Sequence, residues 1–163
     1  MLGLPRRYDI DLERLQRRFV ELARLVHPDY FADCGPEGRL AAMHNSARIN
    51  QAYQTLRDPL GRAEYLLELS GGKSSSEDRS VPGDLLGQMM MLREQIEQAK
   101  ADGDQQALSR LKEQILRRQA GLQQRIARLA RRLGQQPADQ ELLDELRRQL
   151  NAVRYVNNLL SAF

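Results

Sequence analysis

Apolar residues recur every three or four positions along nearly the whole chain, and this spacing predicts helices throughout. No stretch shows the sustained alternation of apolar and polar residues that a half-buried strand requires. The first helix is predicted over residues 11–26, with Asp11 as its cap. Its single buried stripe consists of Leu12, Leu15, Phe19, Leu22 and Val26. Pro28 disfavours helical geometry at His27, so we expect the helix to end there.

A second helix is predicted to begin near Pro36 or Glu37, because proline is tolerated in a first turn. Asp58-Pro59 ends this helix and begins the next one, LGRAEYLLEL, which stops at Ser70-Gly71-Gly72. We expect the apolar face of the second helix to consist of Leu40, Met43, Ala47, Ile49, Tyr53 and Leu56.

The second half of the chain predicts a linker and three longer helices. Residues 71–84 have the serine- and glycine-rich composition of a flexible linker. Asp84 can cap a helix over about 85–101, which is followed by helices over about 104–133 and 138–160. Short connections between long amphipathic helices favour an antiparallel bundle. The predicted fold class is therefore all-α, with a helical hairpin in residues 1–70, the linker 71–84, and an antiparallel three-helix bundle in 85–163.

Apolar residues make up 41% of the 163 positions and charged residues 29%, which is typical of a soluble globular protein. No apolar run approaches the roughly 20 residues needed to span a bilayer, and the N-terminus lacks the features of a signal peptide. We therefore expect a cytoplasmic protein with no membrane partner. Cys34 is the only cysteine, and His27, Cys34 and His44 lack the usual zinc spacing, so we expect no metal and no cofactor.

A basic segment lies on the predicted helix 104–133, where residues 110–132 hold eight basic side chains and one acidic side chain. One interpretation is nucleic-acid binding. The other, which we favour, is a solvated face that is partly neutralised by Asp139, Glu141, Asp144 and Glu145. Nucleic-acid sites usually combine basic residues with stacking aromatic rings, but Tyr155 is the only aromatic residue between positions 66 and 162. We therefore expect no nucleic-acid partner.

The common catalytic motifs of hydrolases, nucleotide-binding loops and zinc proteases are missing from the sequence. His27, Asp29 and Cys34 lie near one another along the chain. A nucleophilic site also needs a positioned third group and an oxyanion pocket, which a loop between two helices does not provide. We therefore expect no enzymatic activity and no catalytic residue.

An arginine-rich amphipathic helix that ends in His27-Pro28-Asp29, followed by a returning helix, resembles a J-domain. The match covers residues 2–70 in order: LGLP, RRFVELARLVHPDYF and INQAYQTLRDPLGRAEYLL. The resemblance implies docking on an ATP-driven chaperone of the HscA/DnaK class and stimulation of its ATP hydrolysis. The chaperone-binding residues that it implies are His27, Pro28, Asp29, Arg14, Arg17, Arg18 and Arg24.

Physical chemistry is consistent with these implied roles. Arginines on the helix 11–26 can meet an acidic surface and steer association. Asp29, on a loop stiffened by Pro28, can accept a charge-assisted hydrogen bond, and His27 can pack beside it.

The second half of the chain extends the resemblance. LGLPRRY and RDPLGRAEYLL, followed by LREQIEQA and LNAVRYVNNL, are similar to the HscB family of J-type co-chaperones in iron–sulfur cluster assembly. That family presents an IscU-type scaffold protein to the chaperone HscA, which implies a scaffold-binding patch on the C-terminal helices. By motif, this patch consists of Leu86, Met90, Arg93, Glu94 and Tyr155.

Helical spacing of three and four places Leu86, Met90 and Arg93–Glu94 on one side of a helix. The alternative is that Met90 is a core residue, because leucine and methionine at this spacing are usually buried. Three consecutive methionines, Met89-Met90-Met91, point about 100° apart, so at least one of them should be accessible.

Two other functions stay open on the sequence alone. The first is a J-domain protein with a different client. The second is a basic helical nucleic-acid-binding protein in which His27-Pro28-Asp29 occurs by chance.

Overall fold

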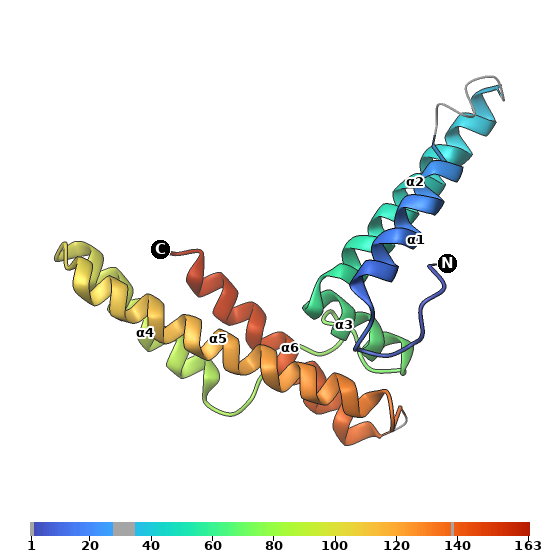
Figure 1. The fold of residues 1–163 in the computed structure, drawn as a ribbon. Helices are drawn as coiled ribbons and strands as arrows, with labels where there is room; N and C mark the ends of the chain where they lie inside the picture. Colours follow the sequence, from blue (N-terminus) through green and yellow to red (C-terminus); the bar gives the residue numbers. More distant parts are fainter. Residues whose placement is uncertain (1, 28–34, 138) are drawn as a thin grey trace. The chain divides into compact units, whose positions relative to one another are not determined.

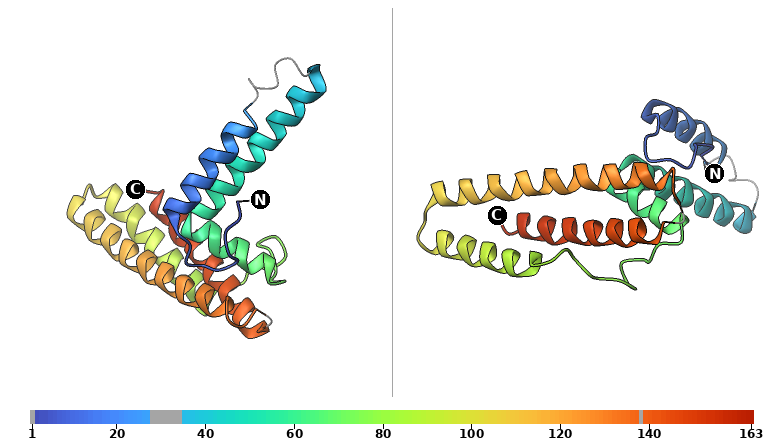
Figure 2. Two further views of the ribbon diagram at one scale, coloured as in Figure 1. Left: turned by 45° about the vertical axis from the view of Figure 1, so that its right-hand side comes forward. Right: turned by 90° about the horizontal axis from the view of Figure 1, so that it is seen from below.

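The computed structural model describes residues 2–27, 35–137 and 139–163, and within these ranges it contains helices and no strand (Figures 1 and 2). The helices are α1 (Leu12–Leu25), α2 (Gly35–Arg57), α3 (Pro59–Leu69), α4 (Leu85–Ala101), α5 (Gln105–Leu133) and α6 (Gln140–Leu160). The chain divides into two compact units, Met1–Tyr65 and Leu66–Phe163. The predicted all-α fold class is confirmed.

The first unit is built on the hairpin of α1 and α2, which lie side by side (Figure 1). Asp11 adopts an extended backbone and its carboxylate accepts a hydrogen bond from the N–H of Arg14 at 2.9 Å, which confirms the predicted cap. The rings of Phe19 and Tyr53 stack with their centroids 4.2 Å apart, and Leu15 is buried beside them. Hydrophobic burial between the two helices therefore holds the hairpin together.

The predicted apolar face of α2 is wrong in its first half. Leu40, Met43 and Ala47 are exposed, whereas Ala42, Ile49 and Tyr53 are buried. At 100° per residue, the three buried residues lie within about 40° of one another, and the three exposed ones lie about 100–160° away from Ala42. The buried side of α2 therefore includes Ala42, and the larger apolar residues Leu40 and Met43 lie outside it.

The third helix begins and ends at the positions that the sequence predicts. Gly71 adopts a φ of 82°, which favours glycine, and the N–H of Gly72 donates to the carbonyl of Leu67 at 2.9 Å. This 6→1 hydrogen bond, together with one from Gly71 to Glu68, closes α3 with a Schellman motif.

The second unit contains the predicted antiparallel bundle, in which α5 runs opposite to α4 and α6 (Figure 2). Asp104 and Asp139 cap α5 and α6, accepting hydrogen bonds from the N–H groups of Ala107 and Leu142. Asp84 precedes α4, but its carboxylate accepts from the side chain of Gln88 at 2.7 Å instead of from a backbone N–H. The residues buried between the three helices are Leu85, Met89, Leu92, Ile96, Ile115, Ala152, Val156 and Leu159.

Part of the predicted linker is fixed to α6. The side-chain amide of buried Asn151 donates to the carbonyl oxygens of Asp78 and Ser80, at 2.9 and 2.8 Å. Val81 then packs against the apolar core of the bundle. The composition of residues 71–84 gives no indication of this attachment.

Candidate partner-binding surfaces

The four arginines implied to bind a chaperone lie together on the outer side of α1. Arg14, Arg17, Arg18 and Arg24 are all exposed, and at 100° per residue they occupy an arc of about 120° that runs from the side opposite buried Leu15 to within about 60° of it. Arg17 pairs with Glu13 at 3.6 Å and Arg18 pairs with Glu21 at 2.9 Å. Exposed pairs of this kind are weak, so a partner can displace them.

The arginine surface leads toward His27, which is exposed and lies directly after α1. The backbone N–H of His27 donates to the carbonyl of Arg24 at 3.4 Å, within the last turn. Pro28 and Asp29, the other two residues of the predicted motif, lie outside the described residues, as does Cys34.

The methionine run on α4 separates into one buried and two exposed side chains. Met89 is 7% exposed and packs in the core, whereas Met90 is 73% exposed and Met91 is also exposed. Leu86, Arg93 and Glu94 are exposed as well. The interpretation of Met90 as a core residue is therefore wrong, and the expected accessibility of at least one methionine is confirmed.

Helix geometry shows which side of α4 carries these residues. At 100° per residue, Leu86, Met90 and Arg93 lie within about 60° of one another, on one flank of the buried row. Lys100 lies on the same flank, and its ammonium donates to the carbonyl of Ala162, directly after α6. This flank of α4 therefore faces the side of α6.

The opposite flank of α4 faces α5. A groove there is lined by Glu94, Gln95 and Gln98 together with Leu111 of α5. Glu94 therefore points farther round the helix than the other three predicted α4 residues.

Tyr155 contributes from α6. It is 40% exposed and precedes Val156, which is buried against the core residues of α4. On the other side of Val156, Asn157 faces α5, because its side chain accepts a hydrogen bond from Gln119. Tyr155 points about 160° away from Asn157 around the helix and therefore lies on the α4 side of α6. Helix geometry thus places Leu86, Met90 and Arg93 of α4 and Tyr155 of α6 on adjoining sides of the two helices, and we call this surface the α4–α6 face.

Comparison with known proteins identifies the family. A sequence model of the HSCB C-terminal oligomerisation domain matches residues 81–163. The chaperone HscB from Vibrio cholerae is 33% identical, with 99% of this chain and 91% of that chain covered and a TM-score of 0.73. The chain belongs to the HscB family. The human co-chaperone protein HscB has the same fold, with a TM-score of 0.78, 24% identity, and coverage of 99% of this chain and 77% of that one.

This membership confirms the resemblance drawn from the sequence. The HscB-family chain is a co-chaperone with an all-α fold, and the family match includes every residue of the α4–α6 face.

A buried arginine that sequence analysis did not single out joins the segment before α1 to the end of α2. Arg62 of α3 is 7% exposed and lies 5.3 Å from the centroid of the Tyr8 ring. Its guanidinium donates to the carbonyls of Leu56 at 2.8 Å, Tyr8 at 2.9 Å and Arg57 at 3.4 Å. Leu56 and Arg57 lie in the last turn of α2, where a cation is favoured by the helix dipole.

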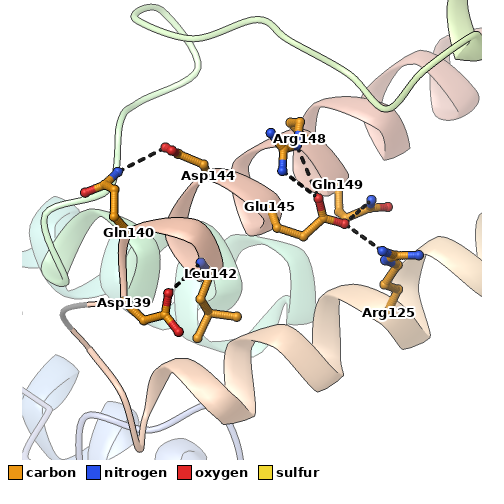
Figure 3. A network of polar contacts seen from close by, with 8 residues as sticks. All are labelled: Arg125, Asp139, Gln140, Leu142, Asp144, Glu145, Arg148 and Gln149. Carbon is orange, nitrogen blue, oxygen red and sulfur yellow. Dashed lines mark hydrogen bonds and ion pairs between the residues drawn. The ribbon is translucent and has the colours of Figure 1, made fainter.

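The basic helix α5 is partly neutralised by α6, as predicted. Glu145 accepts from Arg125 at 2.8 Å, from Arg148 at 2.9 Å and from Gln149 at 2.9 Å (Figure 3). Burial acts to raise the pKa of the Glu145 carboxyl, but hydrogen bonds from Arg148 and Gln149 and the charge of Arg125 outweigh it and hold the pKa below its ordinary value.

Other acidic residues at the start of α6 have different partners. Asp139 caps the helix, and Asp144 accepts from Gln140 at 3.1 Å (Figure 3). Among the acidic residues predicted to offset the basic helix, Glu145 therefore forms an ion pair with α5, through Arg125.

The part of the chain that the structure describes has neither a metal-holding cluster nor a membrane-spanning helix. There, no group of three histidine, cysteine, aspartate or glutamate side chains is arranged to hold a metal ion. In the same ranges, the helices are too short or too polar to cross a membrane.

Proposed function

We propose that this protein stimulates ATP hydrolysis by a chaperone of the HscA/DnaK class and delivers an IscU-type scaffold protein to it for iron–sulfur cluster assembly. The observation that carries the proposal is that each compact unit exposes one surface suited to a protein partner. The first unit exposes the arginines of α1, and the second exposes the α4–α6 face. The two proposed surfaces therefore belong to different units of the chain.

The chaperone surface in this proposal consists of Arg14, Arg17, Arg18, Arg24 and the motif His27-Pro28-Asp29. Exposed arginines on one side of a helix attract an acidic partner surface and accelerate the encounter. Asp29 then accepts a charge-assisted hydrogen bond from the chaperone, which favours the chaperone conformation that hydrolyses ATP. The proposed J-domain comprises residues 1–70.

The scaffold surface in this proposal is the α4–α6 face, with Glu94 at its border. Leu86, Met90 and Tyr155 are large, exposed side chains next to charged Arg93. Such clusters provide the desolvated anchors that dominate protein–protein affinity. Residues 85–163 are the proposed scaffold-binding domain, and residues 71–84 are the proposed linker to the J-domain.

The scaffold role is tested by calorimetric titration of the full chain with an IscU-type scaffold. Tyr155→Ala should weaken binding by about 1–3 kcal/mol, because it removes an interfacial aromatic anchor. Tyr65→Ala is the matched control, since Tyr65 is 42% exposed against 40% for Tyr155 and lies in the first unit. Equal affinities for the two variants would remove Tyr155 from the site.

The chaperone role is tested by single-turnover ATPase assays with a DnaK-class chaperone. Asp29→Asn and His27→Gln should abolish stimulation while the circular dichroism spectrum stays unchanged. His44→Gln is the control for His27→Gln, because His44 is an exposed histidine on α2. Full stimulation by the Asp29→Asn variant would contradict the proposed role of the motif.

A J-domain protein with a different client is the alternative. ATPase stimulation without scaffold binding would favour it. In either case we expect no enzymatic activity of the chain itself, no cofactor, and a cytoplasmic location.

A further inference from the structure

A groove of about 510 Å³ opens in the second unit between the segment that enters α4 and the middle of α5. Its floor is apolar and includes Leu85, Leu122 and Ala152. Arg118, Arg125 and Arg128 of α5 line its rim. An exposed apolar floor beside several cations suggests a binding site, because the floor can bury an apolar group of a ligand while the arginines bind its anionic groups.

The three rim arginines follow one another along one side of α5, within about 80° around the helix. At a rise of 1.5 Å per residue, Arg118 and Arg128 are about 15 Å apart along α5, with Arg125 between them. Arg125 already pairs with Glu145. Within the described ranges, Arg118 and Arg128 have no ion-pair partner. Asp84 is the one acidic residue of the lining, and its carboxylate accepts from Gln88, so the three arginines leave the groove with a net positive charge.

Gly121 lines the same groove and has no structural reason to be glycine. It lies inside a helix of 29 residues, where glycine is among the least favourable residues. A Cβ atom built on Gly121 would meet nothing within 4 Å, so packing within the chain does not demand glycine there. A glycine that opens space beside a charged groove allows another chain to approach the helix closely.

We propose that this groove binds an acidic segment of a partner protein. Carboxylates of the segment pair with Arg118 and Arg128, an apolar side chain enters the floor at Leu85 and Leu122, and the segment crosses α5 over Gly121. The positive charge of the arginines and the apolar floor together favour a peptide, which can offer carboxylates and an apolar side chain at once. Nucleic acid would satisfy the arginines, but the lining has no aromatic side chain on which a base can stack.

This site goes beyond the proposed function, because it is separate from the α4–α6 face. None of the four residues of that face lines the groove, which is formed by the start of α4, the middle of α5 and Ala152 of α6. Binding at the groove is therefore measurable with the full chain alone, without a chaperone or an IscU-type scaffold.

The test is fluorescence anisotropy with a labelled 12-residue peptide that contains glutamates and two central leucines. A matched peptide carries glutamine at every glutamate position. The glutamate peptide should bind saturably and lose affinity as salt rises, and the glutamine peptide should bind at least tenfold more weakly, roughly the loss expected when charge pairing is removed.

Variants then locate the site. The double variant Arg118→Gln/Arg128→Gln should raise the Kd by about tenfold or more, which is the order expected for loss of two charge pairs. Arg117→Gln is the matched control, because Arg117 is adjacent on α5, pairs with Glu113 and does not line the groove. Gly121→Leu should also raise the Kd while the melting temperature stays equal or rises, since leucine favours helix.

Several results would overturn the proposal. These are no saturable binding of the glutamate peptide, equal binding of the glutamine peptide, or undiminished affinity in the double variant or in Gly121→Leu. A labelled oligonucleotide that binds more tightly than the peptide, and loses affinity in the same variants, would also overturn it and assign the groove to nucleic acid.

Discussion

Replacing Arg62 by methionine should unfold the first unit selectively. Two of its hydrogen bonds are short, 2.8 Å to the carbonyl of Leu56 and 2.9 Å to that of Tyr8, whereas the third, to Arg57, is 3.4 Å. A hydrogen bond to a charged group contributes about 1.5–3 kcal/mol, and the ring contact with Tyr8 adds roughly 0.5–1 kcal/mol. Methionine keeps much of the volume, but it leaves the carbonyls without their donors.

Removing a buried charge also removes its desolvation penalty, which offsets part of this loss. We therefore expect a net destabilisation of about 2–4 kcal/mol. A small core of this size rarely supplies more than about 3–5 kcal/mol, so the variant should leave the first unit close to its unfolding midpoint.

Hydrogen exchange with mass spectrometry of the full chain resolves the two units. Peptides from α1 and α2 should lose most of their protection in Arg62→Met, while peptides from α5 and α6 keep theirs. In Arg62→Lys, the protection of α1 and α2 should lie between that of wild type and that of Arg62→Met, because a single ammonium cannot reproduce the planar fork of the guanidinium. Arg48→Met is the control, since Arg48 is exposed on α2 and its change should stay within about 0.5 kcal/mol.

Unchanged protection of α1 and α2 in Arg62→Met would refute the reasoning. Equal loss of protection in both units would also refute it, because it would show that Arg62 acts on the whole chain.

Two further predictions concern the second unit. Asn151→Ala should destabilise it by roughly 1–3 kcal/mol, because the carbonyls of Asp78 and Ser80 lose their donor. The backbone amides around Asp78 and Ser80 should then exchange their hydrogens faster. Unchanged exchange rates there would contradict the attachment of this segment to α6. The lowered pKa of Glu145 means that its carboxylate contributes stability at neutral pH. This contribution is lost as the pH falls below about 4.5, the ordinary pKa of the carboxyl, and through its lower pKa in the folded protein. Urea unfolding from pH 7 to pH 3 should therefore show a gap between wild type and Glu145→Gln that closes as the pH falls, and a constant gap would be inconsistent with the pairing to Arg148.

Helix boundaries were predictable from the sequence because the signals that begin and end a helix are local. Asp104 and Asp139 precede α5 and α6 and cap them, and Gly71 follows α3 in the conformation that glycine favours. Each of these signals acts over three or four residues, which is the distance that sequence patterns describe well.

The contacts that fix each unit were not predictable, because they join distant parts of the chain. The hydrogen bond from Arg62 to Tyr8 spans 54 positions, and the bond from Asn151 to Asp78 spans 73. Periodicity marks which side of a helix is apolar, but it does not tell which polar side chain will find a carbonyl after folding.

The same limit applies to the candidate surfaces. Met89 and Met90 are identical in chemistry and adjacent in sequence, yet one is buried and the other is exposed. The difference arises because the neighbours of α4 cover one side of that helix, and Met90 points about 100° away from Met89. An apolar stripe is thus equally consistent with a core and with a binding surface until the neighbouring helices are placed. Leu86, Met90 and Tyr155 are exposed in the second unit, which excludes a core role for these side chains. Whether they bind a scaffold is the question that the affinity of the Tyr155→Ala variant answers.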